Sequence, residues 1–398
     1  MADNVSSSQP GIEEALSFKI FKITLYSLIL LLCLAGNSMV VFIVCRTKRM
    51  RTPSNLLILN LTLCDLITPL TSIPFDLALE ENDYIWPYGR VLCKTLWPLA
   101  TLSVTSASLT LAFISLDRYR VIMHPFKQRL SSKQVKYSIG MIHLLSLLFV
   151  LPYVYYLDLV VQTRACEETW SEFSYRQAYT VALFVVQYGI PLAFMSVMYT
   201  ITLSNLRLSS GMFESAQPRP LSRVSVDGNM NHSRLDIVSD SQRKASRVTL
   251  GQRHDSLVGR DQNIRATKMF VTVVIVFATC RLPNEIFWLW SDFGKGHQIK
   301  NVSRIAGIIC RMFTYTNSIF NPVIYWIFSK DFQKGFNGIF FSLWKGKRKG
   351  SYDDELDQSE KRFHKLSTLS DSISFVWRKF SRSRNEINGP DLGENLAF

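Results

Sequence analysis

Two opposite charges occur within one otherwise apolar stretch of the sequence. Arg281, in "FATCRLP", and Glu285 are the charged residues of the segment 269–290. They are four positions apart, so a helix places them on one face, where a guanidinium and a carboxylate form an ion pair. An arginine at the centre of a bilayer costs on the order of 2.5 to 3.5 kcal/mol. Arg281 therefore needs such a partner or a water-filled cavity.

Other ionisable residues also lie in apolar segments, namely Asp65, Asp76 and Arg311. These residues form no pair of nucleophile and general base, which covalent catalysis requires. The chain is therefore not expected to be an enzyme. No cofactor and no metal site is predicted either.

Long apolar segments position these charges. Each is about as long as the roughly 20 residues that a helix needs to cross the hydrocarbon core. Four contain no Asp, Glu, Lys or Arg (23–45, 95–116, 137–157 and 177–206), and three contain the charges just named (56–79, 269–290 and 305–328). The sequence predicts an all-α membrane protein that folds as a seven-transmembrane helix bundle.

Basic residues cluster after the first and third spans, and short cytoplasmic loops are rich in Lys and Arg. This predicts a multi-pass membrane protein with an extracellular N-terminus, residues 1–22, followed by the bundle, residues 23–328. The loop 207–265 and the tail 345–398 are polar and predicted to be disordered. Residues 329–344 predict a short amphipathic helix against the inner membrane lipids. The net charge of +14 resides mainly in these cytoplasmic segments, so nucleic acid is not an expected partner.

Two of the seven cysteines are predicted to lie outside the membrane, where disulfides form. Cys93 lies at the outer entry of the third span and Cys166 in the following outer loop, so a disulfide between them is predicted. Cys33, Cys45, Cys64, Cys280 and Cys310 lie in or beside spans and are interpreted as packing residues. Asn4 and Asn301 begin glycosylation sequons on outer segments.

Motifs in five of the spans carry a family resemblance. "GNSMVV" contains Asn37, "LNLTLCD" contains Asp65, and "SLDRYRVIMHP" follows in the third span; Pro191 precedes Tyr199 by eight residues, and "NPVIY" ends the seventh span. In this order the motifs resemble the rhodopsin-like (class A) G-protein-coupled receptors, from about residue 20 to 344. The resemblance implies a G-protein switch formed by Asp117, Arg118, Tyr119, Tyr199, Asn321, Pro322 and Tyr325. It also implies a polar core of Asn37, Asp65, Ser318 and Asn321, to which Arg281 is added here.

The chain departs from the family pattern at several positions. The family commonly has Trp at the positions of Arg281 and His143, Ser at Ala107, and often an acid at Asn263. Because Ala107 removes one ligand of the family's sodium site, Arg281 is proposed to lie between Glu285 and Asp65 as an internal cation. The alternative is a simple Arg281–Glu285 pair.

Two absences narrow the ligand class. Amine receptors have an Asp at the position of Ala100, and opsins have a retinal-bearing Lys at the position of Tyr315. The outer half instead offers charged and aromatic candidates, namely Asp76, Trp97, Tyr175, Tyr179, Glu285, Trp288 and Arg311. These suit a peptide with a basic or amidated end, and the chain resembles the neuropeptide Y, tachykinin and RFamide receptors. The alternative for the aromatic residues is packing against lipid or protein.

The resemblance also implies intracellular partners. Signalling through a heterotrimeric G protein is expected, with arrestin binding to phosphates on the tail at Ser367, Thr368, Ser370 and Ser372. Ser246, in "RKASRV", is a candidate for a basophilic kinase. The competing hypothesis is an atypical seven-transmembrane protein without agonist-driven G-protein signalling.

Overall fold

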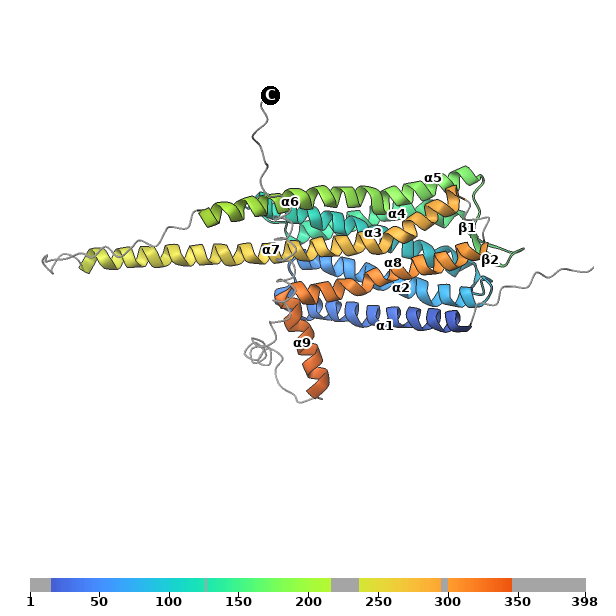
Figure 1. The fold of residues 1–398 in the computed structure, drawn as a ribbon, viewed down its shortest axis with the longest axis horizontal. Helices are drawn as coiled ribbons and strands as arrows, with labels where there is room; N and C mark the ends of the chain where they lie inside the picture. Colours follow the sequence, from blue (N-terminus) through green and yellow to red (C-terminus); the bar gives the residue numbers. More distant parts are fainter. Residues whose placement is uncertain (1–15, 126, 216–235, 295–299, 346–398) are drawn as a thin grey trace, which may run out of the picture. The chain divides into compact units, whose positions relative to one another are not determined.

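Long helices dominate the computed structural model, which describes residues 16–125, 127–215, 236–294 and 300–345 (Figure 1). The first four are α1 (Leu16–Arg46), α2 (Pro53–Glu81), α3 (Gly89–Met123) and α4 (Ser132–Tyr156), with a short 3₁₀ turn, η1 (Lys48–Met50), after α1. The fifth span combines α5 (Phe173–Phe184), a π-helical turn η2 (Val185–Gly189) and α6 (Ile190–Ser215). The sixth and seventh spans belong to α7 (Asp236–Phe293) and α8 (Lys300–Phe328), and α9 (Lys330–Lys345) follows.

Six of these helical stretches are apolar enough and long enough to cross a membrane: α1, α2, α3, α4, the fifth span from Phe173 to Leu206, and α7 from Gln262 to Phe293. Helix α8 has the required length at 29 residues. Its hydropathy is lower because Arg311, Asn317 and Asn321 interrupt its apolar residues. With α8 as the seventh span, the helix bundle predicted from the sequence is confirmed.

Local sequence signals define where the helices begin. The side chain of Thr52 accepts a hydrogen bond from the backbone N–H of Asn55 at 3.3 Å, immediately before Pro53. Ser131 and Gln134 form a capping box, in which each side chain binds the backbone N–H of the other residue. Such caps satisfy the free N–H groups of a first helical turn and typically stabilise a helix by about 1 kcal/mol.

The central element of the first compact unit, Met1–Ile324, is α3, which contacts α2, α4, α6 and α7. Its inward side carries small hydroxyl residues that allow close helix packing, a common feature of membrane bundles. One of them, Thr110, accepts a hydrogen bond from Asn60 of α2 at 2.8 Å. Asn60 also lies 2.9 Å from His143 of α4. His143 thus joins α4 to the centre of the bundle.

Helix extends further than the sequence predicted between the fifth and sixth spans. Helix α6 continues to Ser215 and α7 begins at Asp236, so helix covers much of the segment 207–265 for which disorder was predicted. A helix that is already nucleated within a span can extend at little cost per added residue, even through polar sequence. Residues 216–235 lie outside the described part of the chain, as does the tail from residue 346, so disorder there stays a prediction.

The second compact unit runs from Tyr325 to Phe398 and includes α9. A helix was predicted for residues 329–344, and α9 provides it. The ring of Phe332 stacks on that of Tyr325, with 5.5 Å between their centroids. Gln333 donates a hydrogen bond to the carbonyl oxygen of Ile327 at 3.1 Å. These contacts stabilise the turn that joins α8 to α9.

Candidate functional site

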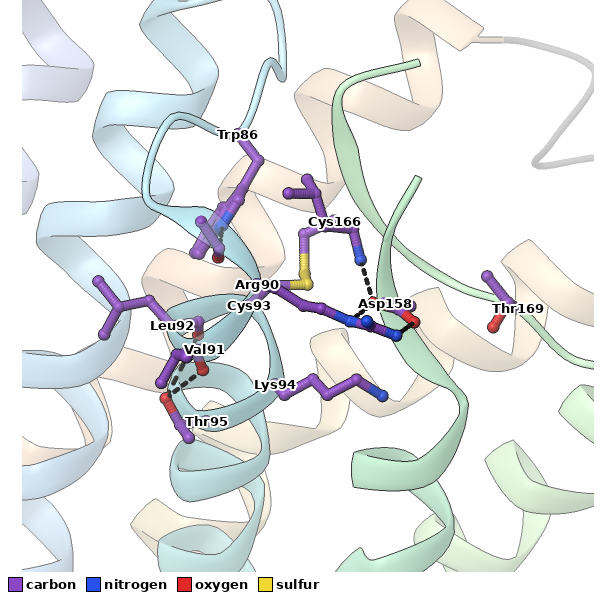
Figure 2. The surroundings of a disulfide bond; sticks show 12 residues. Trp86, Arg90, Val91, Leu92, Cys93, Lys94, Thr95, Asp158, Cys166 and Thr169 are labelled. Carbon is purple, nitrogen blue, oxygen red and sulfur yellow. Dashed lines mark hydrogen bonds and ion pairs between the residues drawn. A yellow bond between two sulfur atoms is a disulfide. The ribbon is translucent and has the colours of Figure 1, made fainter. Parts of the chain in front are cut away.

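One end of the bundle carries a short antiparallel hairpin, β1 (Leu157–Val160) and β2 (Ala165–Glu168), and is called the hairpin end here. Figure 2 shows how the hairpin is joined to the start of α3. The predicted disulfide between Cys93 and Cys166 is present, with 5.7 Å between the two Cα atoms. Beside it, Arg90 donates two hydrogen bonds to the Asp158 carboxylate, the one from Nε at 2.7 Å. The hairpin is therefore held to α3 at two neighbouring points.

The Arg90–Asp158 contact depends on pH. Its hydrogen bonds lower the pKa of Asp158 below the ordinary value. A carboxyl whose pKa is lower in the folded state stabilises the fold above its unfolded pKa, and this contribution is lost as pH falls through the lowered value. The anchor therefore persists at neutral pH.

The disulfide is expected to be required for delivery to the cell surface. Removing a native disulfide typically costs on the order of 2–5 kcal/mol. Cys93→Ser and Cys166→Ser should each reduce surface expression, measured by flow cytometry with an N-terminal epitope. The double variant should be no worse than either single variant, because both break one bond. Cys45→Ser, at an exposed free cysteine, is the matched control. Additive losses in the double variant would contradict a shared bond.

A cavity of about 550 Å³ lies at the hairpin end of the bundle. Residues of α2, α3, α4, α5, α7, α8 and the π-helical turn η2 line it, together with both hairpin strands. Its walls carry five carboxylates (Asp76, Glu80, Glu167, Glu168 and Glu285) and three guanidinium groups (Arg176, Arg281 and Arg311). Cavities of this size with convergent polar groups are typical ligand sites.

Six of the seven candidate ligand residues line this cavity: Asp76, Trp97, Tyr179, Glu285, Trp288 and Arg311. The seventh, Tyr175, is not among the lining residues and has 53% of its surface exposed in the first turn of α5. The sequence did not indicate several further lining residues, including Glu80, Tyr153, Arg176 and Asn284. These side chains come from four different helices, and no local pattern indicates which of them meet.

An ion-pair cluster forms one wall of the cavity. Arg311 of α8 donates a hydrogen bond to Glu80 of α2 at 2.6 Å and lies 3.8 Å from Asp76. Asp76 also accepts hydrogen bonds from Tyr315 at 2.5 Å and Trp97 at 3.2 Å. The buried Lys22 of α1 lies 3.7 Å from Glu80. In this cluster the two cavity carboxylates are neutralised by internal cations.

Arg281 and Glu285 line the cavity from α7. Nη2 of Arg281 donates a hydrogen bond to Oε1 of Glu285 at 2.9 Å, and both residues are buried. The guanidinium also lies over the ring of Phe277, 5.8 Å from its centroid. The ion pair expected from the four-residue spacing is therefore formed.

The proposed contact between Arg281 and Asp65 is not formed. Asp65 instead accepts hydrogen bonds from Asn321 at 2.6 Å and from Ser318 at 3.3 Å. Asn37 of α1 completes this polar core by donating to the carbonyl oxygen of Ser318 at 2.9 Å. Among the described residues, no hydrogen bond or ion pair joins Arg281 to this core. The geometry therefore favours the simpler alternative, a pair formed by Arg281 and Glu285.

Arg118 lies at the other end of α3 and is buried. Its Nη2 donates hydrogen bonds to the neighbouring Asp117 and, at 2.5 Å, to Ser54 of α2. Its guanidinium also lies 5.6 Å from the ring centroid of Phe270 on α7. Sequence reasoning looked for an acid near Asn263 and missed this aromatic contact between the third and sixth spans. Tyr199, another predicted switch residue, is buried on α6.

The predicted glycosylation and phosphorylation sites lie outside the described residues or within helices at positions whose side chains are not described. Asn4 and the tail positions Ser367, Thr368, Ser370 and Ser372 are outside the described residues. Asn301 lies in the first turn of α8 and Ser246 lies within α7. Glycosylation and phosphorylation at these positions stay predictions.

The motifs and the bundle agree with a comparison to known families. Residues 36–325 match the family of 7 transmembrane receptors of the rhodopsin family. The chain belongs to this family. It is a rhodopsin-like (class A) G-protein-coupled receptor, and such proteins are multi-pass proteins of the plasma membrane that act as receptors rather than enzymes.

Curated relatives of this receptor are named as receptors for neuropeptide FF and for galanin. Neuropeptide FF receptor 1 of Rattus norvegicus is 28% identical over 335 residues, covering 80% of this chain and 69% of that protein. Galanin receptor 2a of Danio rerio is 29% identical over 321 residues, covering 79% of this chain and 77% of that protein. Neuropeptide FF receptor 2 of Mus musculus is 27% identical over 337 residues, covering 80% of this chain and 72% of that protein.

Proposed function

We propose that this receptor is activated by a neuropeptide with a cationic group, which enters the cavity from the hairpin end. In this proposal the hairpin end and the N-terminus are extracellular. The observation that carries the proposal is the cavity of about 550 Å³ with its excess of carboxylates over guanidinium groups. The relatives named as neuropeptide FF and galanin receptors support a peptide as the ligand.

The excess negative charge is concentrated on β2. Asp76, Glu80 and Glu285 each have an internal arginine partner, so a ligand cation must compete with that arginine to reach them. Glu167 is exposed and makes no ion pair with any described residue. Glu168 lies 3.9 Å from Arg176, whose nearer partner is Asp292 at 3.1 Å. We therefore place the ligand cation first at Glu167 and Glu168 rather than at Asp76 or Glu285.

Aromatic side chains supply the apolar part of the site. Trp97, Tyr153, Tyr179 and Trp288 line the cavity. Tyr179 is held by a hydrogen bond to the carbonyl oxygen of Phe149 at 3.1 Å and packs against the ring of Trp170. Rigid aromatic side chains offer a large contact area at a low cost in conformational entropy, and this suits them to pack against peptide side chains.

Neutralising the two hairpin carboxylates is expected to weaken a cationic agonist. The test begins with neuropeptides applied to cells that express the receptor, with second messengers as the readout. Glu167→Gln/Glu168→Gln should then lower agonist potency about tenfold, equivalent to about 1.4 kcal/mol. Glu172→Gln, an exposed acid just beyond the hairpin, is the matched control. Potency that is unchanged in the double variant would place the ligand cation elsewhere, and silence towards all peptides would contradict a peptide receptor.

Intracellular partners complete the proposal. The heterotrimeric G protein binds at the end of α3 that carries Arg118, with Tyr199, Asn321, Pro322 and Tyr325 as further switch residues. Arrestin recognises the phosphorylated serine cluster of the tail, and the apolar side of α9 contacts membrane lipids. The aromatic residues of α9, such as Phe340 with 55% of its surface exposed, support the lipid contact.

A further inference from the structure

Ser54 of α2 contacts the arginine that the proposed switch releases. Its Oγ accepts a hydrogen bond at 2.5 Å from Nη2 of Arg118, which also donates to Asp117. Arg118 has only 8% of its surface exposed, whereas Ser54 is half-buried. A group attached to the Ser54 hydroxyl would therefore lie against the guanidinium of Arg118.

The residues before Ser54 are those that a basophilic kinase recognises. In "KRMRTPS", Arg51 lies three positions before Ser54, and Lys48 and Arg49 precede it. All three basic side chains are exposed, and the candidate kinase site at Ser246 has an arginine at the same spacing. In the proposed orientation this end of the bundle is cytoplasmic, where protein kinases and ATP are present.

The surroundings of Ser54 suit a phosphate once it is attached. Ser54 is the second residue of α2, whose first turn contains no acidic residue, and helix N-termini stabilise anions. Nε of Arg118 is enclosed and has no hydrogen-bond partner among the described residues. It lies on the same edge of the guanidinium plane as Nη2, and such an edge can bind two phosphate oxygens at once.

We propose that Ser54 is a phosphorylation site whose phosphate holds Arg118 at α2 and thereby reduces G-protein activation. A basophilic kinase transfers the terminal phosphoryl group of ATP to Oγ of Ser54. The bond between that phosphorus and ADP breaks, an Oγ–P bond forms, and the hydroxyl proton passes to a base of the kinase. The phosphate carries about −1.5 to −2 charges at pH 7 and binds a guanidinium more strongly than a hydroxyl does.

Asp117 competes with the phosphate for the same guanidinium, because it also accepts a hydrogen bond from Nη2. The basic residues Arg49 and Arg51, just before α2, offset the added negative charge. In this structure Arg118 contacts the Ser54 hydroxyl, which is freed when the guanidinium leaves. Phosphorylation should therefore follow activation and return Arg118 to α2. This inference rests on the proposed role of Arg118 in activation.

The modification is tested on the purified full-length receptor, incubated with ATP and a kinase that requires arginine three residues before its serine. Mass spectrometry should find phosphate on Ser54. Arg51→Gln should reduce it at least about tenfold, equivalent to about 1.4 kcal/mol of recognition. Ser246, which keeps its own Arg243, is the internal control in this variant. Arg118→Ala frees the hydroxyl, so absence of phosphate on Ser54 both there and in wild type would overturn the proposal.

The contact with Arg118 is tested by thermal unfolding of the unliganded receptor. Ser54→Asp and Ser54→Asn have nearly equal size and differ in charge. The Asp variant should unfold about 2 °C higher than the Asn variant, and this difference should vanish when Arg118→Ala is added. Thr52→Asp, which places the same charge at the exposed N-cap of α2, is the control, and its effect should not depend on Arg118. An Asp–Asn difference that is absent, or unchanged by Arg118→Ala, contradicts the contact.

The consequence for signalling is measured with a neuropeptide that activates wild type in the peptide test above. At equal surface expression, Ser54→Asp should lower the second-messenger response about tenfold relative to Ser54→Asn, and Thr52→Asp should not lower it. Equal responses of the two Ser54 variants overturn the inhibitory role. If no peptide activates wild type, the proposed function fails, while mass spectrometry and unfolding still decide whether Ser54 is modified and contacts Arg118.

Discussion

Arg311→Ala is expected to remove most of the receptor from the cell surface. The guanidinium of Arg311 lies 2.6 Å from Glu80, whose side chain is only 1% exposed. Without Arg311 the buried Glu80 keeps only the more distant Lys22, at 3.7 Å, as a counter-charge, and removing one partner of a buried ion pair costs about 3–5 kcal/mol. Whole domains have unfolding free energies of only about 5–15 kcal/mol, so this loss is severe. Surface expression and the thermal unfolding of purified receptor measure it.

Two variants show whether charge is the cause. Arg304→Ala removes an exposed arginine of the same helix, which lies over the ring of Tyr84 at 4.6 Å, and should have a small effect. Arg311→Ala/Glu80→Gln removes both charges and should recover part of the lost stability. Lys22 keeps a partner in this variant because it also lies 2.9 Å from Glu81. Wild-type stability of Arg311→Ala would show that the pair is not needed for folding.

Arg118→Ala should abolish G-protein activation while surface expression and agonist binding stay close to wild type. Arg118 lies at the opposite end of α3 from the cavity and is not among the cavity residues. In the proposed mechanism its guanidinium leaves Asp117, Ser54 and Phe270 and meets the G protein, and alanine removes that group. Second-messenger output and radioligand binding are measured on the same cells.

The contacts of Arg118 supply the comparison variants. Ser54→Ala removes one hydrogen bond and leaves the guanidinium in place, so agonist-driven signalling should persist. Phe270→Leu weakens the contact between α3 and α7, and cation–π contacts are worth about 0.5–2 kcal/mol. Basal signalling should therefore rise in this variant. Undiminished agonist response in Arg118→Ala would defeat the proposed role of Arg118.

Local pattern predicted those features that depend on one segment at a time. The lengths of the apolar segments predicted the membrane spans, and the four-residue spacing of Arg281 and Glu285 predicted their ion pair. The Cys93–Cys166 disulfide followed from topology, which left only these two thiols outside. Each of these inferences requires only the helical repeat or the side of the membrane on which a segment lies. None requires the relative rotation of two helices.

Contacts between helices were largely beyond prediction. Arg311 and Glu80 are separated by 231 residues, and their meeting depends on the rotation and axial offset of α8 against α2. The same reason explains the failed contact of Arg281 with Asp65: the sequence places both in the bundle but not within reach. The contact of Arg118 with Phe270 was missed because only acids were considered as partners of a switch arginine.

The attachment of the hairpin to α3 has a mechanical consequence. Cys93 and Arg118 belong to one continuous helix and are about 37 Å apart along its axis. The disulfide bonds β2 covalently to α3. A ligand that contacts Glu167 or Glu168 on β2 is therefore connected through this bond to the helix that carries Arg118 at its other end. The disulfide limits how far β2 can move from α3, and movement of the hairpin away from α3 also requires the Arg90–Asp158 contact to break.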